Sequence, residues 1–172
     1  MENVILVNDK DEEIGICEKI KAHVEGKKHR AFSVFIFNNK GQLLIQKRAK
    51  CKYHCPGLLT NSCCSHPRQN EDILDAGKRR LQEELGFTCE VKEVDVVKYN
   101  FSFNNGLSEN EIDHILIGNY SGEVNINKSE VESYEYLDLD FLEKDILKNK
   151  EKYTPWFIYI FKNIKTYIEK LV

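Results

Sequence analysis

The N-terminal third of the chain alternates short apolar runs with polar turns, a pattern typical of β-hairpins. Residues 4–7 form one β-prone run, and the polar residues 9–11 can turn the chain back into residues 14–17. Residues 31–37 are rich in β-branched and aromatic side chains, and an Asn-Asn-Lys-Gly turn leads from them into residues 42–47. The pattern therefore predicts two hairpins.

The spacing of the apolar residues becomes helical after residue 70. Five residues fall on one stripe at helical intervals: Ile73, Leu74, Gly77, Leu81 and Leu85. Gly86 comes directly after this stripe and is a suitable helix stop. The pattern predicts an amphipathic helix that ends at this glycine.

The C-terminal half continues with strands and then with helices. The expected elements are strands at residues 90–103, 111–120 and 134–137, a helix at 139–148, and a helix from 155 nearly to the end. The last helix has Thr154 as its expected N-cap and Pro155 at its first position. Mixed strands flanked by helices imply an α/β sandwich, and a length of 172 residues fits a single domain over residues 1–172.

The segment between these two halves, residues 50–68, has the composition of a long loop. It concentrates turn-forming residues together with cysteines, histidines and basic residues. Loops of this length in a compact domain are usually functional. We therefore expect part of the chemistry of the protein to lie here.

Charge and hydropathy argue against two classes of function. The net charge is −3, whereas nucleic-acid-binding domains usually carry a basic face, so no nucleic-acid partner is expected. No apolar run approaches the roughly 20 residues that span a bilayer, and the acidic N-terminus does not resemble a signal peptide. These features predict a cytoplasmic protein that does not enter a membrane.

Six cysteines are present: Cys17, Cys51, Cys55, Cys63, Cys64 and Cys89. In a reducing cytosol they are expected to be free thiols rather than three disulfides. Cys51 and Cys55 are spaced loosely like half of a zinc site, but no second cysteine pair follows them. Unpaired thiols in a loop are the favoured interpretation.

The charged residues of the helix predicted after residue 70 resemble the Nudix box, G-x5-E-x7-R-E-U-x-E-E-x-G-U, where U is aliphatic. The matching positions are Glu71, Arg79, Leu81, Glu83, Glu84, Gly86 and Phe87. Ser65 stands in place of the first glycine and Arg80 in place of a glutamate. Nudix enzymes hold magnesium on carboxylates of this helix, and the metal neutralises a diphosphate. The resemblance implies a Nudix-type α/β/α sandwich with a mixed sheet.

Arg80 departs from the box at a position where the family has a metal-binding glutamate. A positive charge suits phosphate binding but removes a metal ligand, which disfavours ordinary diphosphate hydrolysis. Three functions remain open: an activity other than hydrolysis, a Nudix hydrolase acting on a nucleoside diphosphate derivative, and a non-catalytic metal or diphosphate sensor. By itself, a charged helix face of this kind is equally explained by solvated ion pairs one turn apart.

Three further motifs resemble those of the type 1 isopentenyl-diphosphate isomerases, which belong to the Nudix superfamily. Residues 60–67, Thr-Asn-Ser-Cys-Cys-Ser-His-Pro, resemble the motif T-N-S-x-C-x-H-P, and residues 109–111 resemble E-N-E. His23 and His29 resemble the pair of histidines that precedes the first core strand. The resemblance extends from about residue 4 to 156 and implies an enzyme that converts isopentenyl diphosphate into dimethylallyl diphosphate in isoprenoid biosynthesis.

The histidines and glutamates of these motifs form a candidate metal site: His23, His29, His66, Glu109 and Glu111. Imidazole and carboxylate donors suit Mn²⁺, Zn²⁺ or Mg²⁺. Glu109 and Glu111 point to the same face if they lie on a strand. The resemblance implies one ion here, and a Mg²⁺ bound with the diphosphate next to Glu84 and the backbone carbonyl of Cys64. His54 and His114 lie outside the motifs and are interpreted as ordinary surface or core residues.

The implied reaction moves a double bond within a five-carbon diphosphate, through a tertiary carbocation. It needs an acid and a base on opposite sides of the carbon chain, with water excluded. The resemblance implies Cys64, two residues before the histidine of its motif, on one side, and Glu111 with Tyr99 on the other. Trp156 would hold the cation against its ring. The implied diphosphate-binding residues are Lys19, Arg48, Lys52 and Arg80, and we expect a monomer or a weak homodimer.

Overall fold

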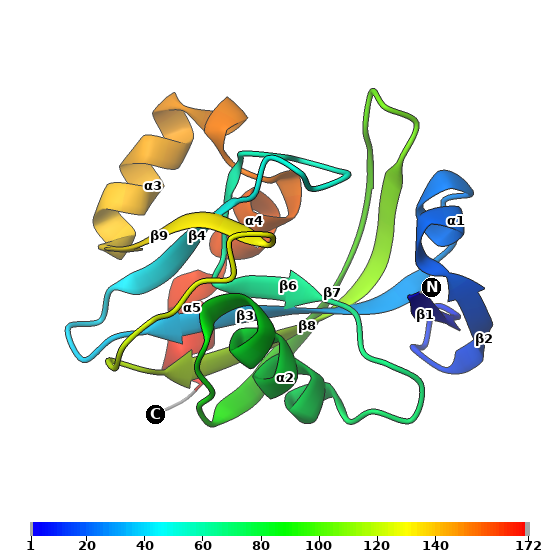
Figure 1. The fold of residues 1–172 in the computed structure, drawn as a ribbon, viewed down its shortest axis with the longest axis horizontal. Helices are drawn as coiled ribbons and strands as arrows, with labels where there is room; N and C mark the ends of the chain where they lie inside the picture. The colour runs from blue at the N-terminus through cyan, green and yellow to red at the C-terminus, as the bar shows by residue number, and fades with distance from the viewer. Residues whose placement is uncertain (1, 171–172) are drawn as a thin grey trace.

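A mixed β-sheet of nine strands runs through residues 2–170, the part of the chain that this computed structural model describes (Figure 1). Its central strand is β3 (His29–Phe37), which pairs in parallel with β8 (Ser108–Asn119) on one side. On the other side β3 pairs antiparallel with the short strand β6 (Cys63–Ser65). β7 (Val91–Ser102) forms a long antiparallel hairpin with β8. The centre of the sheet therefore joins three segments that are distant in sequence.

The remaining strands lie at the two ends of this central group. β1 (Asn3–Val7) and β2 (Glu13–Glu18) form the first predicted hairpin, beside the start of β3. β4 (Leu43–Arg48) follows β3 in the second predicted hairpin and pairs with β9 (Val131–Leu137) and with β5 (Leu59–Thr60). Both predicted hairpins are thus confirmed, and the sheet mixes parallel and antiparallel pairs.

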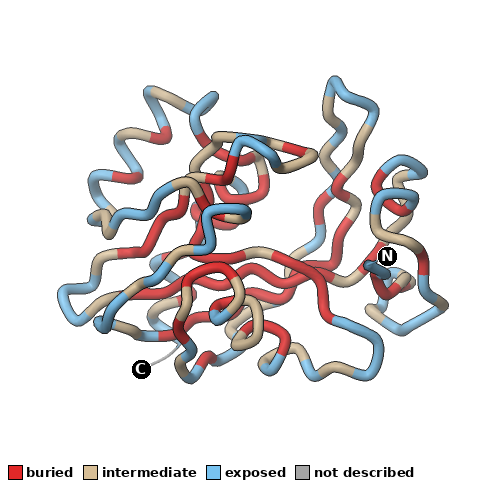
Figure 2. Tube along the Cα trace, viewed as in Figure 1, coloured by how far each residue is buried: buried red, intermediate tan, exposed pale blue. Residues whose placement is uncertain are grey.

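Helices cover both faces of the sheet. α2 (Ile73–Leu85) packs on one face, and α3 (Leu139–Lys148), α4 (Pro155–Phe161) and α5 (Ile164–Glu169) lie on the other. The alternation of side chains along β3 explains the two cores: Val34 and Ile36 pack with α2, whereas Phe35 and Phe37 pack with the C-terminal helices. This arrangement is the α/β/α sandwich expected from the sequence, and Figure 2 shows the buried positions following the central strands.

The helix α2 begins and ends where its sequence predicts. The side chain of Asp72 caps it by accepting hydrogen bonds from the backbone N–H groups of Leu74 and Asp75. Gly86 ends it in the left-handed conformation, with φ of 73°. The buried stripe orients the helix, so its charged residues lie at the edge of its contact with the sheet.

Three elements differ from the sequence prediction. The segment predicted as one loop contains the short strands β5 and β6, because it is anchored to β4 and β3 by pairings that local sequence does not reveal. A six-residue helix, α1 (Lys19–Val24), follows β2; it is too short to show a helical period, and Glu18 caps it. The last predicted helix is broken at residues 162–163 into α4 and α5, with a 3₁₀ turn (Lys150–Lys152) preceding α4.

Thr154 occupies the expected N-cap position of α4, with Pro155 in the first turn, but its side chain makes no capping hydrogen bond. Its hydroxyl instead lies 2.9 Å from the hydroxyl of Thr60. The pair ties the start of α4 to β5, which fixes the position of the helix over the sheet. Within residues 2–170, none of the helices combines the length and apolar character needed to cross a bilayer.

Gly86 should not tolerate a side chain. A Cβ there would lie 2.5 Å from the backbone oxygen of Asn125, in addition to requiring a left-handed backbone. Gly86→Ala is expected to lower the free energy of unfolding by about 2–5 kcal/mol, from backbone strain and overpacking together. Urea denaturation measures this loss. Gly41→Ala is the matched control, because Gly41 has φ of 75° but no atom within 4 Å of its Cβ position. Equal losses in the two variants would contradict the close approach at Gly86.

Candidate functional site

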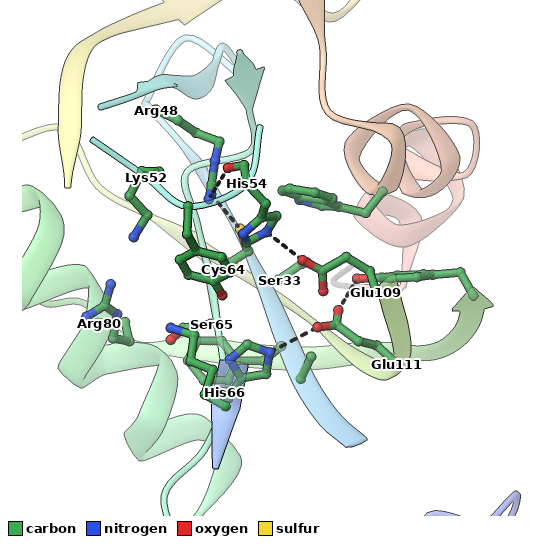
Figure 3. Close-up of a pocket in the computed structure, with 16 residues that line it drawn as sticks. Ser33, Arg48, Lys52, His54, Cys64, Ser65, His66, Arg80, Glu109 and Glu111 are labelled. Atoms are coloured by element: carbon green, nitrogen blue, oxygen red, sulfur yellow. Dashed lines mark hydrogen bonds and ion pairs between the residues drawn. The ribbon is translucent and has the colours of Figure 1, made fainter. Parts of the chain in front are cut away.

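A pocket opens where strands β3, β6 and β8 meet the loop after β4 and the start of α4 (Figure 3). Its wall consists mainly of polar and charged residues, and Trp156, Phe32 and Ala31 are its apolar members. The wall includes Lys19, Arg48, Lys52, Cys64, His66, Arg80, Tyr99, Glu109, Glu111 and Trp156. Most of the residues that the sequence motifs singled out therefore converge on one place.

The five candidate metal ligands form one buried cluster. Each can offer a nitrogen or oxygen atom, and these atoms all lie within 4.8 Å of one another: His23, His29, His66, Glu109 and Glu111. Glu111 Oε1 lies 3.1 Å from His29 Nε2 and 3.0 Å from His66 Nε2. Glu109 Oε2 lies 3.4 Å from His23 Nε2. This cluster has the donors and the compactness of a divalent metal site.

The sheet assembles this cluster from four segments. His29 is the first residue of β3 and the Cα partner of Glu111 on β8. Glu109 and Glu111 alternate along β8 and so share one face, as predicted. His66 directly follows β6, and His23 comes from α1. The short helix that local sequence did not reveal thus carries one of the five residues.

The orientations of the imidazoles fit a metal ion. Nδ1 of His23 lies 2.7 Å from the backbone oxygen of Lys19, and Nδ1 of His29 lies 2.8 Å from that of Lys27. Each Nδ1 can donate a proton to its carbonyl, and in that tautomer Nε2 offers its lone pair to a metal ion in the cluster. His29 Nε2 lies only 3.2 Å from His66 Nε2, a close approach that a cation between them would stabilise. Burial lowers the pKa of His66 to about 3, so this ring is in the neutral, metal-binding form.

Glu111 is also held from the side opposite the imidazoles. The hydroxyl of Tyr99 donates to Glu111 Oε2 at 2.6 Å, and it lies 3.0 Å from Asp113 Oδ2. Ser33 Oγ donates to the same oxygen of Asp113 at 2.7 Å. Burial raises the pKa of Tyr99 and of Asp113 well above their usual values. Tyr99 is therefore a neutral hydroxyl that fixes the carboxylate of Glu111.

The two adjacent cysteines point to opposite faces of β6. Cys64 lines the pocket, whereas Cys63 is fully buried in the core beneath α2. The motif spacing had selected Cys64, and the geometry agrees with it. Burial raises the pKa of Cys64 to about 12, although Arg48 opposes the shift, so the thiol carries its proton at neutral pH. The six cysteines, all within the described chain, form no disulfide.

Four basic residues expected to bind diphosphate line the pocket: Lys19, Arg48, Lys52 and Arg80. Lys19 is paired with Glu2 at 2.9 Å, and Lys52 with Glu130 at 2.5 Å. The guanidinium of Arg48 lies 5.4 Å from the ring centre of Trp156. Lys19, Lys52 and Arg80 are thus already paired with carboxylates, whereas Arg48 has no carboxylate partner among the described residues.

The Nudix-box carboxylates take different positions around this pocket. Arg80 bonds Glu84, and the second oxygen of Glu84 accepts from Gln46 at 2.8 Å, so Glu84 lies behind Arg80. Glu71 is held by two nitrogens of Arg79, at 2.6 and 2.9 Å. Neither glutamate is part of the pocket wall.

His54 is a site residue that the sequence interpretation placed elsewhere. It comes from the loop between β4 and β5, and its Nε2 lies 2.5 Å from Glu109 Oε1 (Figure 3). Its ring packs against Tyr53 and Trp156, with ring centres 4.4 and 5.5 Å away. The sequence interpretation left His54 outside the candidate site because no motif marks it, whereas the structure places it in the pocket wall and in contact with a candidate metal ligand. His114 is held between Asp11 and Glu93, away from the pocket.

The amino-acid sequence is similar to a known protein family and to individual curated proteins. Residues 27–157 match the model of the NUDIX domain family. An isopentenyl-diphosphate Delta-isomerase of Burkholderia multivorans is 46% identical over 156 residues, which cover 91% of this chain and 89% of that protein. An isopentenyl-diphosphate Delta-isomerase of Serratia proteamaculans is 44% identical over 163 residues, covering 95% and 91%.

Solved structures share the fold at lower identity. A crystal structure from Deinococcus radiodurans has a TM-score of 0.69 at 21% identity and covers 86% of this chain and 90% of its own. A MutT protein from Methanosarcina mazei has a TM-score of 0.65 at 19% identity, with 81% and 94% covered. These two likenesses concern the fold alone.

Replacing His66 should empty the cluster of metal. His66→Ala removes one of five donors, and we expect Mn²⁺ affinity to fall by more than about 100-fold, since outer partners of metal ligands alone are worth about 10–100-fold. Titration of metal-free protein with Mn²⁺ measures the loss. His114→Ala, which alters a histidine outside the pocket, serves as the control and should bind normally. Full metal content in the His66→Ala protein would show that the site is wrongly assigned.

Proposed function

This chain belongs to the NUDIX family and, within it, to the isopentenyl-diphosphate Delta-isomerases, and from this membership we infer that it isomerises isopentenyl diphosphate to dimethylallyl diphosphate. The observation that carries the assignment to this pocket is the placement of Cys64 and Glu111. Cys64 reaches it from β6 and Glu111 from β8, the strands on the two sides of β3. Two groups able to exchange protons thus approach one small space from different sides.

We propose that the five clustered ligands hold one divalent ion, Mn²⁺, Zn²⁺ or Mg²⁺. Three imidazoles and two carboxylates suit these ions, and the Nδ1 contacts of His23 and His29 with backbone carbonyls, which leave Nε2 directed at the cluster, support the assignment. When bound, the ion supplies positive charge that keeps the buried carboxylates ionised. We further propose that a Mg²⁺ enters with the diphosphate and uses the backbone carbonyl of Cys64 and Glu84, whose bond with Arg80 it would replace.

The proposed chemistry is a protonation followed by a deprotonation. The terminal carbon of the alkene gains a proton, a tertiary carbocation forms, and the carbon next to the diphosphate-bearing carbon loses a proton. We assign one transfer to the Cys64 thiol and the other to Glu111, whose carboxylate Tyr99 orients. General acid–base groups of this kind contribute typically about 10²–10⁴-fold to a rate.

Trp156 is proposed to shelter the cation. Only 3% of its surface is exposed, and it is one of the apolar members of the pocket wall. A cation over a desolvated indole gains about 2 kcal/mol, and the same ring keeps water from trapping the intermediate. The guanidinium of Arg48 already packs beside this ring. This contact supports the proposal that the face of the Trp156 ring accommodates positive charge.

The diphosphate is proposed to bind to Lys19, Arg48, Lys52 and Arg80. Guanidinium and ammonium groups form strong charge-assisted hydrogen bonds with phosphate oxygens. In the structure, Lys19 and Lys52 each have a carboxylate partner near the pocket opening, Glu2 and Glu130. A diphosphate of higher charge would compete with these surface partners for the same cations.

Hydrolysis of a nucleoside diphosphate derivative is the weaker alternative. In the Nudix box this reaction relies on metal-binding carboxylates, yet Glu71 is engaged by Arg79, and Arg80 replaces a glutamate. The isomerase assignment instead uses the buried histidine cluster and Cys64. We propose that the enzyme acts in the cytoplasm as a monomer or weak homodimer, without nucleic-acid or membrane partners.

Purified protein loaded with Mn²⁺ and supplied with Mg²⁺ should convert isopentenyl diphosphate to dimethylallyl diphosphate. Separation of the two isomers measures the product. The same preparation incubated with a panel of nucleoside diphosphate derivatives should release no phosphate or nucleoside monophosphate above background. Nucleotide cleavage without isomer formation would replace the assignment with the hydrolase alternative.

Cys64→Ala should reduce isomerisation by at least about 10²-fold, because the proton-transfer group on one side of the substrate is lost. Mn²⁺ affinity and the unfolding midpoint should stay close to those of the wild type, since Cys64 offers no side-chain ligand to the cluster. Steady-state rates and metal titration together check this expectation.

Cys63→Ala is the matched control for Cys64→Ala. Its side chain packs in the core beneath α2, so it should cost roughly 1 kcal/mol of stability and leave the rate nearly unchanged. An inactive Cys63→Ala enzyme beside an active Cys64→Ala enzyme would place the catalytic group one residue earlier in the chain.

A further inference from the structure

The two carboxylates of the metal cluster are held in the same manner. Glu111 directs Oε1 toward two imidazoles of the cluster, and its Oε2 accepts a hydrogen bond from Tyr99. Glu109 directs Oε2 toward His23, and its Oε1 lies 2.5 Å from Nε2 of His54. His54 thus contacts the outer oxygen of Glu109 in the same way that Tyr99 contacts the outer oxygen of Glu111.

The short contact with Glu109 defines the orientation of His54. An ionised carboxylate has no hydrogen to give, so Nε2 of His54 must donate the hydrogen in this bond. Nδ1 of His54 is buried and has no partner among the described residues. The ring therefore uses its one strong polar contact on a residue of the metal cluster.

The surroundings of His54 fix its ring in place. It is 7% exposed and packs between the rings of Tyr53 and Trp156, with Phe103 at 6.1 Å. Its backbone oxygen accepts a hydrogen bond from Arg48 at 3.2 Å. The loop between β4 and β5 is thereby fastened both to the cluster and to a residue of the basic side of the pocket.

We propose that His54 is a positioning residue that holds Glu109 in the orientation required for metal binding, an inference that rests on the metal centre of the proposed function. A carboxylate with one oxygen fixed by a donor presents its other oxygen in a defined direction. Outer partners of metal ligands typically contribute about 10–100-fold to metal affinity or activity. This chain thus adds a fourth imidazole that supports the centre without joining its ligands.

The geometry distinguishes this role from that of a sixth ligand. The ligand atoms of the five clustered residues lie within 4.8 Å of one another, and His54 is not a member of that group. Its Nε2 is directed to the oxygen of Glu109 opposite the one that faces His23. A donor hydrogen on Nε2 also occupies the lone-pair position that a metal would need.

Glutamine and asparagine at position 54 separate the two roles. The amide nitrogen of glutamine can occupy the place of Nε2 and donate to Glu109, whereas that of asparagine is too short to reach it. His54→Asn should weaken Mn²⁺ binding by about 10–100-fold, and His54→Gln should retain most of the affinity. Titration of metal-free protein with Mn²⁺ alone, read by the electron paramagnetic resonance signal of the free ion, measures both without a substrate.

His114→Gln is the control, because His114 also contacts two carboxylates but lies outside the pocket; its Mn²⁺ affinity should equal that of the wild type. Thermal unfolding of the metal-free proteins shows that each variant is folded. If His54→Asn binds Mn²⁺ with wild-type affinity, the positioning role is overturned while the metal centre stands. If His54→Asn and His54→Gln lose equal affinity, the positioning role is overturned in favour of a direct metal ligand. A wild-type protein that binds no Mn²⁺ overturns the proposed metal centre and this inference together.

Discussion

The parallel pairing of β3 with β8 is the constraint on which the site depends. It places His29 beside Glu111 at one end of the buried central strands. Two carboxylates and three imidazoles in such a place are costly to desolvate unless they satisfy one another or bind a cation. The bonds from Tyr99, His54 and the backbone carbonyls each satisfy part of that requirement, and a divalent ion would satisfy the remainder. The same low-dielectric setting that makes the cluster costly also excludes water from a carbocation.

The N-terminal segment acts as a support for this arrangement rather than as an independent unit. β1 and β2 pair with each other and join β3 at its first residue, and α1 then delivers His23 to the cluster. Arg30 bonds Asp11, and His114 lies between Asp11 and Glu93, so the hairpin is tied to the far face of the central strands. Lys19 follows directly from β2 and lines the pocket.

Much of the fold and of the candidate site could be predicted from the sequence, because both depend on local periodicity and on short motifs. The stripe from Ile73 to Leu85 gave α2, and alternation along residues 109–111 put both glutamates on one face. His54 could not be predicted, because its role comes from a loop that β5 folds back over β8 and from a contact across 55 positions of sequence. α1 was missed because a single helical turn and a half has no period to detect. A contact between distant segments decided the first case, and the shortness of the helix decided the second.

The central claim is that one pocket gives a proton to the substrate on one side and removes a proton on the other. Its most direct test is the reaction of isopentenyl diphosphate with the metal-loaded enzyme in D₂O, followed by nuclear magnetic resonance. Because the proton on the donor group exchanges with solvent, the account predicts dimethylallyl diphosphate with deuterium in the newly formed methyl group. Dimethylallyl diphosphate that forms without solvent deuterium would contradict it, since a single group would then be carrying the same proton from one carbon to the other.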